Sequence, residues 1–174
     1  MNEAIKNMLT RRSCKSFKPD AVSAELIDQI IGAGLYAPSG MNRQGSIILA
    51  VTDKATRDKL SKLNSKYDFA HRPDPFYNAP VVLSVLDPKA APTAVYDGSL
   101  VMENLMLAAH SLGLGSCWIH RAKEVFDDPE GREILEKAGI DPDEYVGVGN
   151  CVLGYPDKET DTDKPRKEGR VYKI

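Results

Sequence analysis

The segment that most constrains the fold is residues 94–112, the most apolar helical stretch of the chain. The apolar run around 100–114 contains Glu103, Asn104 and His110 and falls short of the roughly 20 apolar residues needed to cross a bilayer. A helix this apolar has to be covered on several sides. We therefore expect a buried, central helix, and no membrane partner.

Short apolar runs alternate with helical patterns along the rest of the chain. Buried strands are predicted at 45–52, 80–86, 116–120 and 145–153. Further helices are predicted at 2–9, 23–37, 53–63 and 128–138, three of them from their N-terminal capping residues Ser23, Asp53 and Asp128. Residues 64–79 are polar and contain proline, so an irregular loop is expected there. This order predicts one α+β domain over 1–174, with a small central sheet flanked by helices.

Composition excludes several classes of protein. The chain has 174 residues, a formal net charge of −2 and 42% hydrophobic residues, which is close to the globular average. Disorder and a collagen-like repeat are therefore excluded, and a nucleic-acid partner is not expected without a basic excess. The polar tail, 157–174, carries too little apolar surface to fold alone, so we expect it to pack on a partner subunit.

The cysteines and histidines show no metal-binding pattern. There are three of each, widely spaced: Cys14, Cys117, Cys151, His71, His110 and His120. An odd number of cysteines gives no disulfide framework, and neither set has the spacing of a zinc site. We expect no metal, and a reducing compartment such as the cytoplasm.

Basic residues are concentrated in two places that are far apart in the sequence. Arg11, Arg12, Ser13 and Lys15 lie in one short segment after the first helix, and the tail carries a second basic cluster. Arginine forks and serine hydroxyls can hold a phosphate. A solvated basic turn at a helix C-terminus is the alternative.

Two other segments have the composition of ligand-binding loops. Residues 37–44 join a helix to a strand and carry amide and hydroxyl groups that can hydrogen-bond a flat heterocycle, although an ordinary turn is equally compatible. Trp118 and His120 lie at the end of a predicted strand, which is a common ligand position, although a core tryptophan and a surface histidine are the simpler alternative. The glycine pairs at 113–115 and 147–149 do not form a dinucleotide-binding fingerprint.

In this order and spacing, the segments resemble the nitroreductase family of flavin enzymes. The matching pieces are Arg11-Arg12-Ser13-x-Lys15-x-Phe17, Ala37-Pro38-Ser39-Gly40-x-Asn42-x-Gln44, Glu103-Asn104-Leu105, Leu112-Gly113-Leu114-Gly115-Ser116-Cys117-Trp118-Ile119, Leu153-Gly154-Tyr155-Pro156 and Lys164-Pro165-Arg166-Lys167. Each piece alone is weak, but together they cover nearly the whole chain.

The resemblance implies a nitroreductase-like fold, an intertwined homodimer and FMN bound at the subunit interface. It implies that Arg11, Arg12, Ser13 and Lys15 hold the phosphate and ribityl chain, completed by tail residues Lys164 and Arg166. The serine-glycine loop, residues 37–44, would reach the flavin from the other subunit with Pro38, Ser39, Gly40, Asn42 and Gln44. The end of the predicted strand 116–120, with Trp118, Ile119 and His120, would lie along the flavin ring and place a backbone N–H near its N5 atom.

The resemblance also implies a two-step reaction. NADH or NADPH would donate hydride to the flavin and leave, and a nitroaromatic or quinone would then enter the same slot. Because the flavin carries this chemistry, no catalytic side chain is required. His120 is the one candidate for proton delivery.

The sequence departs from the family pattern at two positions. Lys15 replaces a common arginine, and Gln44-Gly45-Ser46 replaces Gln-Pro-Trp, which removes a bulky aromatic from the substrate pocket. Loop 64–79 is the segment available to cover the flavin, and its residues Phe69, His71, Phe76 and Tyr77 are either slot-lining or packing residues. A dehalogenase or flavin-fragmenting enzyme of the same fold, and a non-catalytic flavin-binding protein, are the alternatives.

Overall fold

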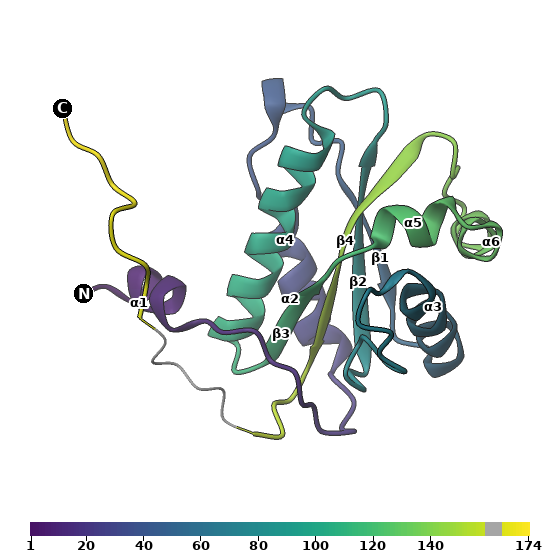
Figure 1. Ribbon diagram of the computed structural model, residues 1–174, viewed down its shortest axis with the longest axis horizontal. Helices are drawn as coiled ribbons and strands as arrows, with labels where there is room; N and C mark the ends of the chain where they lie inside the picture. Colours follow the sequence, from purple (N-terminus) through teal and green to yellow (C-terminus); the bar gives the residue numbers. More distant parts are fainter. Residues whose placement is uncertain (159–164) are drawn as a thin grey trace.

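A four-stranded antiparallel sheet forms the centre of the protein. The computed structural model describes residues 1–158 and 165–174 (Figure 1). The strand order is β1-β2-β4-β3, and each pair of neighbours is antiparallel. The strands are β1 (Ile47–Val51), β2 (Val81–Pro88), β3 (Gly115–Ile119) and β4 (Tyr145–Gly154). The sheet predicted from the four apolar runs is therefore confirmed.

Helices cover both faces of this sheet. They are α1 (Glu3–Thr10), α2 (Ala24–Leu35), α3 (Lys54–Tyr67), α4 (Ala94–Ser111), α5 (Ala122–Asp127) and α6 (Pro129–Lys137), with a short 3-10 turn η1 (Gly40–Asn42). Ser23, Asp53 and Asp128 accept backbone N–H groups at the starts of α2, α3 and α6, as predicted. Local capping chemistry therefore determined where these helices begin.

Two apolar cores separate the layers. Helices α2 and α4 pack on one face, where Ile30, Leu83 and Leu105 are fully buried. Helices α3, α5 and α6 cover the other face, where Leu86 and Leu135 are fully buried (Figure 1). The apolar stretch 94–112 is thus a helix, α4, but within one chain only its sheet-facing side is buried, because Val95, Tyr96 and Leu100 are exposed.

Three local features differ from the sequence-based expectation. Helix α3 continues to Tyr67 rather than ending near residue 63. Helix α5 was not predicted, because a six-residue helix has almost no stability of its own and depends on packing. Phe76 is fully buried in the core beneath α3 and is therefore a packing residue, not a wall of a substrate slot.

None of the helices in the described part of the chain is both long and apolar enough to cross a membrane.

Candidate functional site

The basic segment 11–18 runs along the edge of the sheet. Ser13 forms a parallel bridge with Ser116 on β3, and the backbone N–H of Lys18 donates to the carbonyl of Tyr155 at 2.9 Å. A third backbone bond joins Asp157 to Ser16 at 3.0 Å. The fold therefore holds the segment between the start of β3 and the first residues of the tail.

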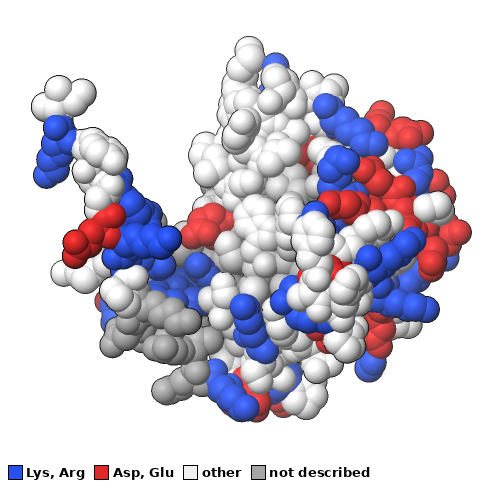
Figure 2. Space-filling model, viewed as in Figure 1, with Lys and Arg blue, Asp and Glu red and all other residues white. Residues whose placement is uncertain are grey.

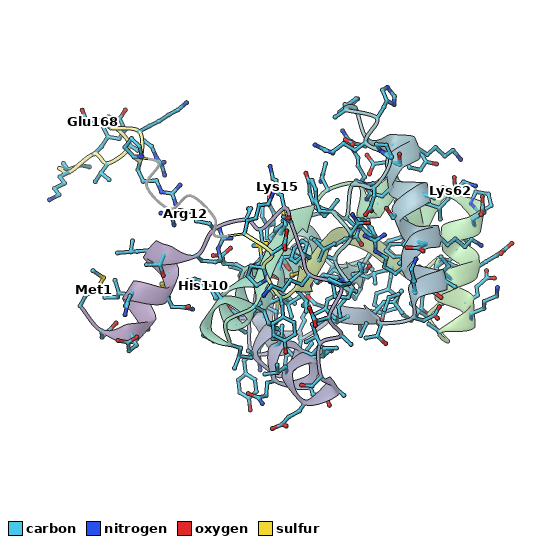
Figure 3. All side chains as sticks on the ribbon, turned by 90° about the horizontal axis from the view of Figure 1, so that it is seen from below. Met1, Arg12, Lys15, Lys62, His110 and Glu168 are labelled. Atoms are coloured by element: carbon cyan, nitrogen blue, oxygen red, sulfur yellow. The ribbon has the colours of Figure 1, made fainter. Side chains whose placement is uncertain are left out.

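The cations of this segment differ in what they contact. Arg12 donates from Nη1 to the carbonyls of Leu9 and Arg11, at 2.6 and 2.8 Å. The Nη1 atom of Arg11 is buried and has no hydrogen-bond partner among the described residues, and its Nε lies 4.0 Å from Glu103. Lys15 is exposed at the surface (Figure 3), where its Nζ atom lies 6.0 Å from the ring centroid of Tyr77. A buried, unused guanidinium donor beside two further cations is suited to an anionic group such as a phosphate.

Within one chain, the described part of the tail contributes less to this site than segment 11–18 does. Arg166 is exposed, and Lys164 lies outside the described residues. The tail leaves the body beside segment 11–18, at residues 155–157, and its described end projects away from the sheet (Figure 1).

Helix α1 and the basic segment are anchored to the C-terminal half of α4. The Nδ2 atom of Asn7 donates to the carbonyl of Leu107 at 2.9 Å, and Oγ1 of Thr10 lies 2.9 Å from Nε2 of His110. Burial and the charges of Arg11 and Arg12 lower the pKa of His110. His110 is therefore predominantly neutral at neutral pH.

The serine-glycine loop is a rigid turn held by its own polar groups. The backbone N–H of Gln44 donates to Oγ of Ser39 at 2.9 Å, and Nε2 of Gln44 donates to Oδ1 of Asn42 at 3.0 Å. Met41, Asn42 and Gln44 all have positive φ, between 51 and 55°. Backbone held in this region of φ by non-glycine residues is uncommon and occurs preferentially at ligand sites.

The N-terminal turn of α4 holds this loop in place. The backbone N–H of Gly40 donates to Oδ1 of the buried Asp97 at 3.0 Å. A Cβ atom at Gly40 would lie 2.6 Å from Oγ1 of Thr93, so glycine is required for this approach. A cavity of about 390 Å³ borders the loop, and its lining includes Pro38, Ser39, Gln44 and several apolar side chains.

Trp118, near the end of β3, is half-buried beside the apolar core on the α4 face of the sheet. The indole of Trp118 packs closely against Gly149 on the α4 face of the sheet: a Cβ atom added to Gly149 would lie 2.7 Å from Nε1 of Trp118. Trp118 is therefore largely a packing residue. Ile119 is buried and His120 is exposed. The carbonyl of His120 accepts from Nδ2 of Asn64 at 2.8 Å.

Sequence reasoning missed Arg121, the next residue. It has φ 81° and ψ 12°, a left-handed conformation that few non-glycine residues adopt, and it is the N-cap residue directly before α5. The residue type arginine does not predict a left-handed backbone. The position of Arg121 directly after a predicted strand, which is a common ligand position, is the sequence feature that could have marked it as a candidate.

The structure brings some of the predicted site residues together and leaves others apart. Arg11, Arg12, Ser13 and Lys15 lie on one segment beside β3, whereas loop 38–44 lies at the other end of α4. Asp97 and His110, which hold the two groups, are about 20 Å apart along the helix at 1.5 Å per residue. Within one subunit, the two groups therefore lie at opposite ends of one helix.

The three cysteines offer no nucleophile. All three are buried and free, and burial raises the pKa of each thiol, that of Cys151 to about 12. The thiols are therefore protonated at neutral pH.

Comparisons with known proteins give a consistent result. The model of the nitroreductase family matches residues 8–67 and 66–155. A provisionally named NADH dehydrogenase/NAD(P)H nitroreductase of Archaeoglobus fulgidus is 34% identical over 166 residues, which cover 92% of this chain and 90% of the relative.

Two similar solved structures contain a flavin. A Bacteroides fragilis nitroreductase with bound FMN has a TM-score of 0.91 and 28% identity, and a Desulfitobacterium hafniense nitroreductase with bound FMN has a TM-score of 0.88 and 26% identity. Each comparison covers 100% of both chains.

Proposed function

The chain belongs to the nitroreductase family, and we propose that it is an FMN-dependent oxidoreductase that uses NADH or NADPH to reduce nitroaromatic or quinone-type acceptors. The observation that carries this proposal is the buried Nη1 atom of Arg11, which has no partner among the described residues and lies in a segment with Arg12 and Lys15. A phosphate supplies the acceptor oxygens that such a donor requires.

Each part of the cofactor has candidate partners in the chain. We assign the phosphate and ribityl chain to Arg11, Arg12, Ser13 and Lys15, with Lys164 and Arg166 of the tail. Loop 38–44 and the end of β3 would flank the flavin ring. When bound, FMN supplies the hydride chemistry, passing reducing equivalents from the nicotinamide to the acceptor. The protein then has to bind, orient and exclude water, and the exposed His120 is our candidate for delivering a proton.

The distance between the two groups favours a site shared by two subunits. Loop 38–44 lies about 20 Å from the basic segment along α4, so it reaches the same cofactor more readily from a second copy. We therefore propose a homodimer in which each FMN site takes the basic segment from one subunit and the loop from the other.

Exposed apolar side chains support this homodimer. No residue of α1 is buried, although Ile5, Met8 and Leu9 are apolar. Further large apolar side chains are exposed on α2, α4 and the tail: Leu35, Tyr36, Val95, Tyr96, Leu100, Val171, Tyr172 and Ile174. Figure 2 shows an uncharged surface over the region of α4, while charged residues gather over α3, α5 and α6. An apolar surface this extensive is typical of a subunit interface.

The free cysteines are compatible with a cytoplasmic location.

The purified protein tests these proposals directly. It should be yellow, or become so on adding FMN, and NAD(P)H should bleach the flavin in the absence of oxygen. Menadione or nitrofurazone should restore the colour, and light scattering should give a dimer mass. A protein that ignores FMN would contradict the proposed function, and a bound flavin that NAD(P)H never reduces would indicate a non-catalytic flavin-binding protein.

A further inference from the structure

The peptide group between His120 and Arg121 is held from the interior of the protein. The Nδ2 atom of Asn64, on α3, donates to the carbonyl of His120 at 2.8 Å. Asn64 is only 1% exposed, so its amide has no access to water. A buried amide needs a partner within the protein, and here that partner is a carbonyl just beyond the end of β3. The carbonyl of His120 is thus fixed on the side of α3.

The N–H of the same peptide group points the other way. The described residues contain no cis peptide bond, and in a planar trans peptide the C=O and the following N–H point in opposite directions. The N–H of Arg121 therefore faces away from Asn64 and α3. This N–H has no acceptor among the described residues, although the carbonyl of Arg121 accepts from the N–H of Val125 at 2.9 Å. The end of β3 thus presents a free backbone donor.

The observed orientation of this peptide group is the strained one. Arg121 has φ 81° and ψ 12°, a left-handed conformation that costs free energy in any residue with a Cβ atom. A half-turn of the peptide plane would bring φ of Arg121 to about −100°, which an arginine adopts without strain. The same half-turn would break the bond from Asn64. The buried amide of Asn64 therefore opposes a relaxation that the backbone of Arg121 favours.

We propose that Asn64 is a positioning residue of the cofactor site, which keeps the N–H of Arg121 turned toward an acceptor atom of the flavin ring by holding the carbonyl of His120. This inference rests on the proposed function, in which the end of β3 flanks that ring. The ring of FMN carries nitrogen and oxygen acceptors that a fixed backbone donor can bind. After a half-turn of the peptide, a carbonyl oxygen would face these acceptors, and no hydrogen bond could form.

The first test is the orientation of the peptide group in the unliganded protein. Asn64→Leu keeps the size of the side chain but removes the donor. Crystal structures of the wild-type protein and of this variant, both without FMN, should show the peptide turned in the variant alone, with φ of Arg121 near −100°. Asn64→Ala removes the same donor without adding apolar bulk, and replaces Asn64→Leu if that variant does not fold.

The second test is the affinity for FMN, measured by flavin fluorescence titration. Asn64→Leu should raise the Kd about five- to thirty-fold. Adding Arg121→Gly to Asn64→Leu should return the Kd to within about three-fold of wild type, because glycine adopts positive φ without strain. Damaged packing around position 64 would not be rescued in this way.

The matched control is a second buried hydrogen bond of the sheet. The Oγ atom of Ser84 donates to Oδ1 of Asn150 at 2.6 Å, and both residues are at most 1% exposed. Ser84→Ala removes this bond without touching the carbonyl of His120. It should leave the peptide orientation unchanged and alter the Kd for FMN less than about two-fold.

Four results would overturn the inference. A peptide that keeps its orientation in both Asn64 variants would show that Asn64 does not hold it. A turned peptide with an unchanged Kd would show that the N–H of Arg121 does not contact the cofactor, and a Kd that Arg121→Gly does not rescue would show that Asn64 acts through packing. A wild-type protein that binds no FMN would overturn the proposed function as well. That failure is distinguishable, because the orientation of the peptide is measured without FMN.

Discussion

The Nε2 atom of His110 lies 2.9 Å from Oγ1 of Thr10, and this contact joins the last turn of α4 to the residue that precedes Arg11. The basic segment is thus positioned by helix α4 as well as by the edge of the sheet. The same contact places the titratable imidazole of His110 near Arg11 and Arg12, which we assign to the phosphate.

The first prediction concerns the pH dependence of stability through His110. Burial, followed by the charges of Arg11 and Arg12, lowers the pKa of His110 from its ordinary 6.5. The unfolded chain then binds a proton more readily than the folded one. The free energy of unfolding should be constant above about pH 6.5 and fall as the pH drops through that value.

Urea unfolding between about pH 5 and 7.5 measures this slope. His110→Gln should flatten it, and bound FMN should also reduce it, because a phosphate offsets the charge of the arginines. An unchanged slope in His110→Gln would assign the pH dependence to another group.

The second prediction concerns the phosphate site. Arg12→Ala and Arg166→Ala should each weaken FMN binding by about 1.5–3 kcal/mol, since each removes a charged hydrogen bond. This corresponds to roughly 10- to 150-fold in Kd, measured by flavin fluorescence titration. Lys18→Ala is the matched control, because Lys18 is an exposed cation of the same segment outside the predicted site. Equal losses at all three positions would indicate a general charge effect.

The third prediction concerns Asp97 and the loop it holds. Its two carboxylate oxygens accept from Gly40 N–H and Thr93 Oγ1, at 3.0 and 2.8 Å, and asparagine can replace only one of these acceptors. Asp97→Asn should lower the free energy of unfolding by about 1–2 kcal/mol and weaken FMN binding by a similar amount.

Chemical denaturation and FMN titration measure the two effects. Asp28→Asn, at an exposed position on α2, should stay within about 0.5 kcal/mol of wild type. If Asp97→Asn lost stability but bound FMN normally, the loop would not contact the cofactor.

The fourth prediction concerns acid stability at Asp128. Hydrogen bonds from Lys66 and Tyr67 and from the backbone of Glu130 lower the pKa of Asp128 to about 2. The folded state therefore gains stability above the ordinary value of 3.8, and this stability is lost as the pH falls toward 2. Asp128→Asn keeps a helix cap but loses the charge.

Circular dichroism during an acid titration checks this prediction. The variant should be less stable at neutral pH and should lose less of its stability between about pH 4 and 2 than wild type. Asp127→Asn is the control at the neighbouring exposed position, and an identical response of both variants would contradict the role of Asp128.

The sequence alone was sufficient for features that depend on neighbouring residues. Ser23, Asp53 and Asp128 cap their helices because the capping bond is made within three residues of each cap. The apolar runs predicted the four strands, because burial requires apolar side chains whatever the topology. The order and spacing of the motifs were also sufficient to identify the family.

Tertiary structure decided what depends on distant contacts. Helix α3 extends to Tyr67 because Tyr67 and Lys66 bond to Asp128, which lies far along the chain. The left-handed backbone of Arg121 and the short helix α5 are stabilised by packing that no local pattern encodes. The candidate cofactor site depends on distant contacts in the same way. Residues 11–15 and loop 38–44 are both recognisable in the sequence, but only the fold places them at opposite ends of α4, because their separation depends on the length and contacts of that helix.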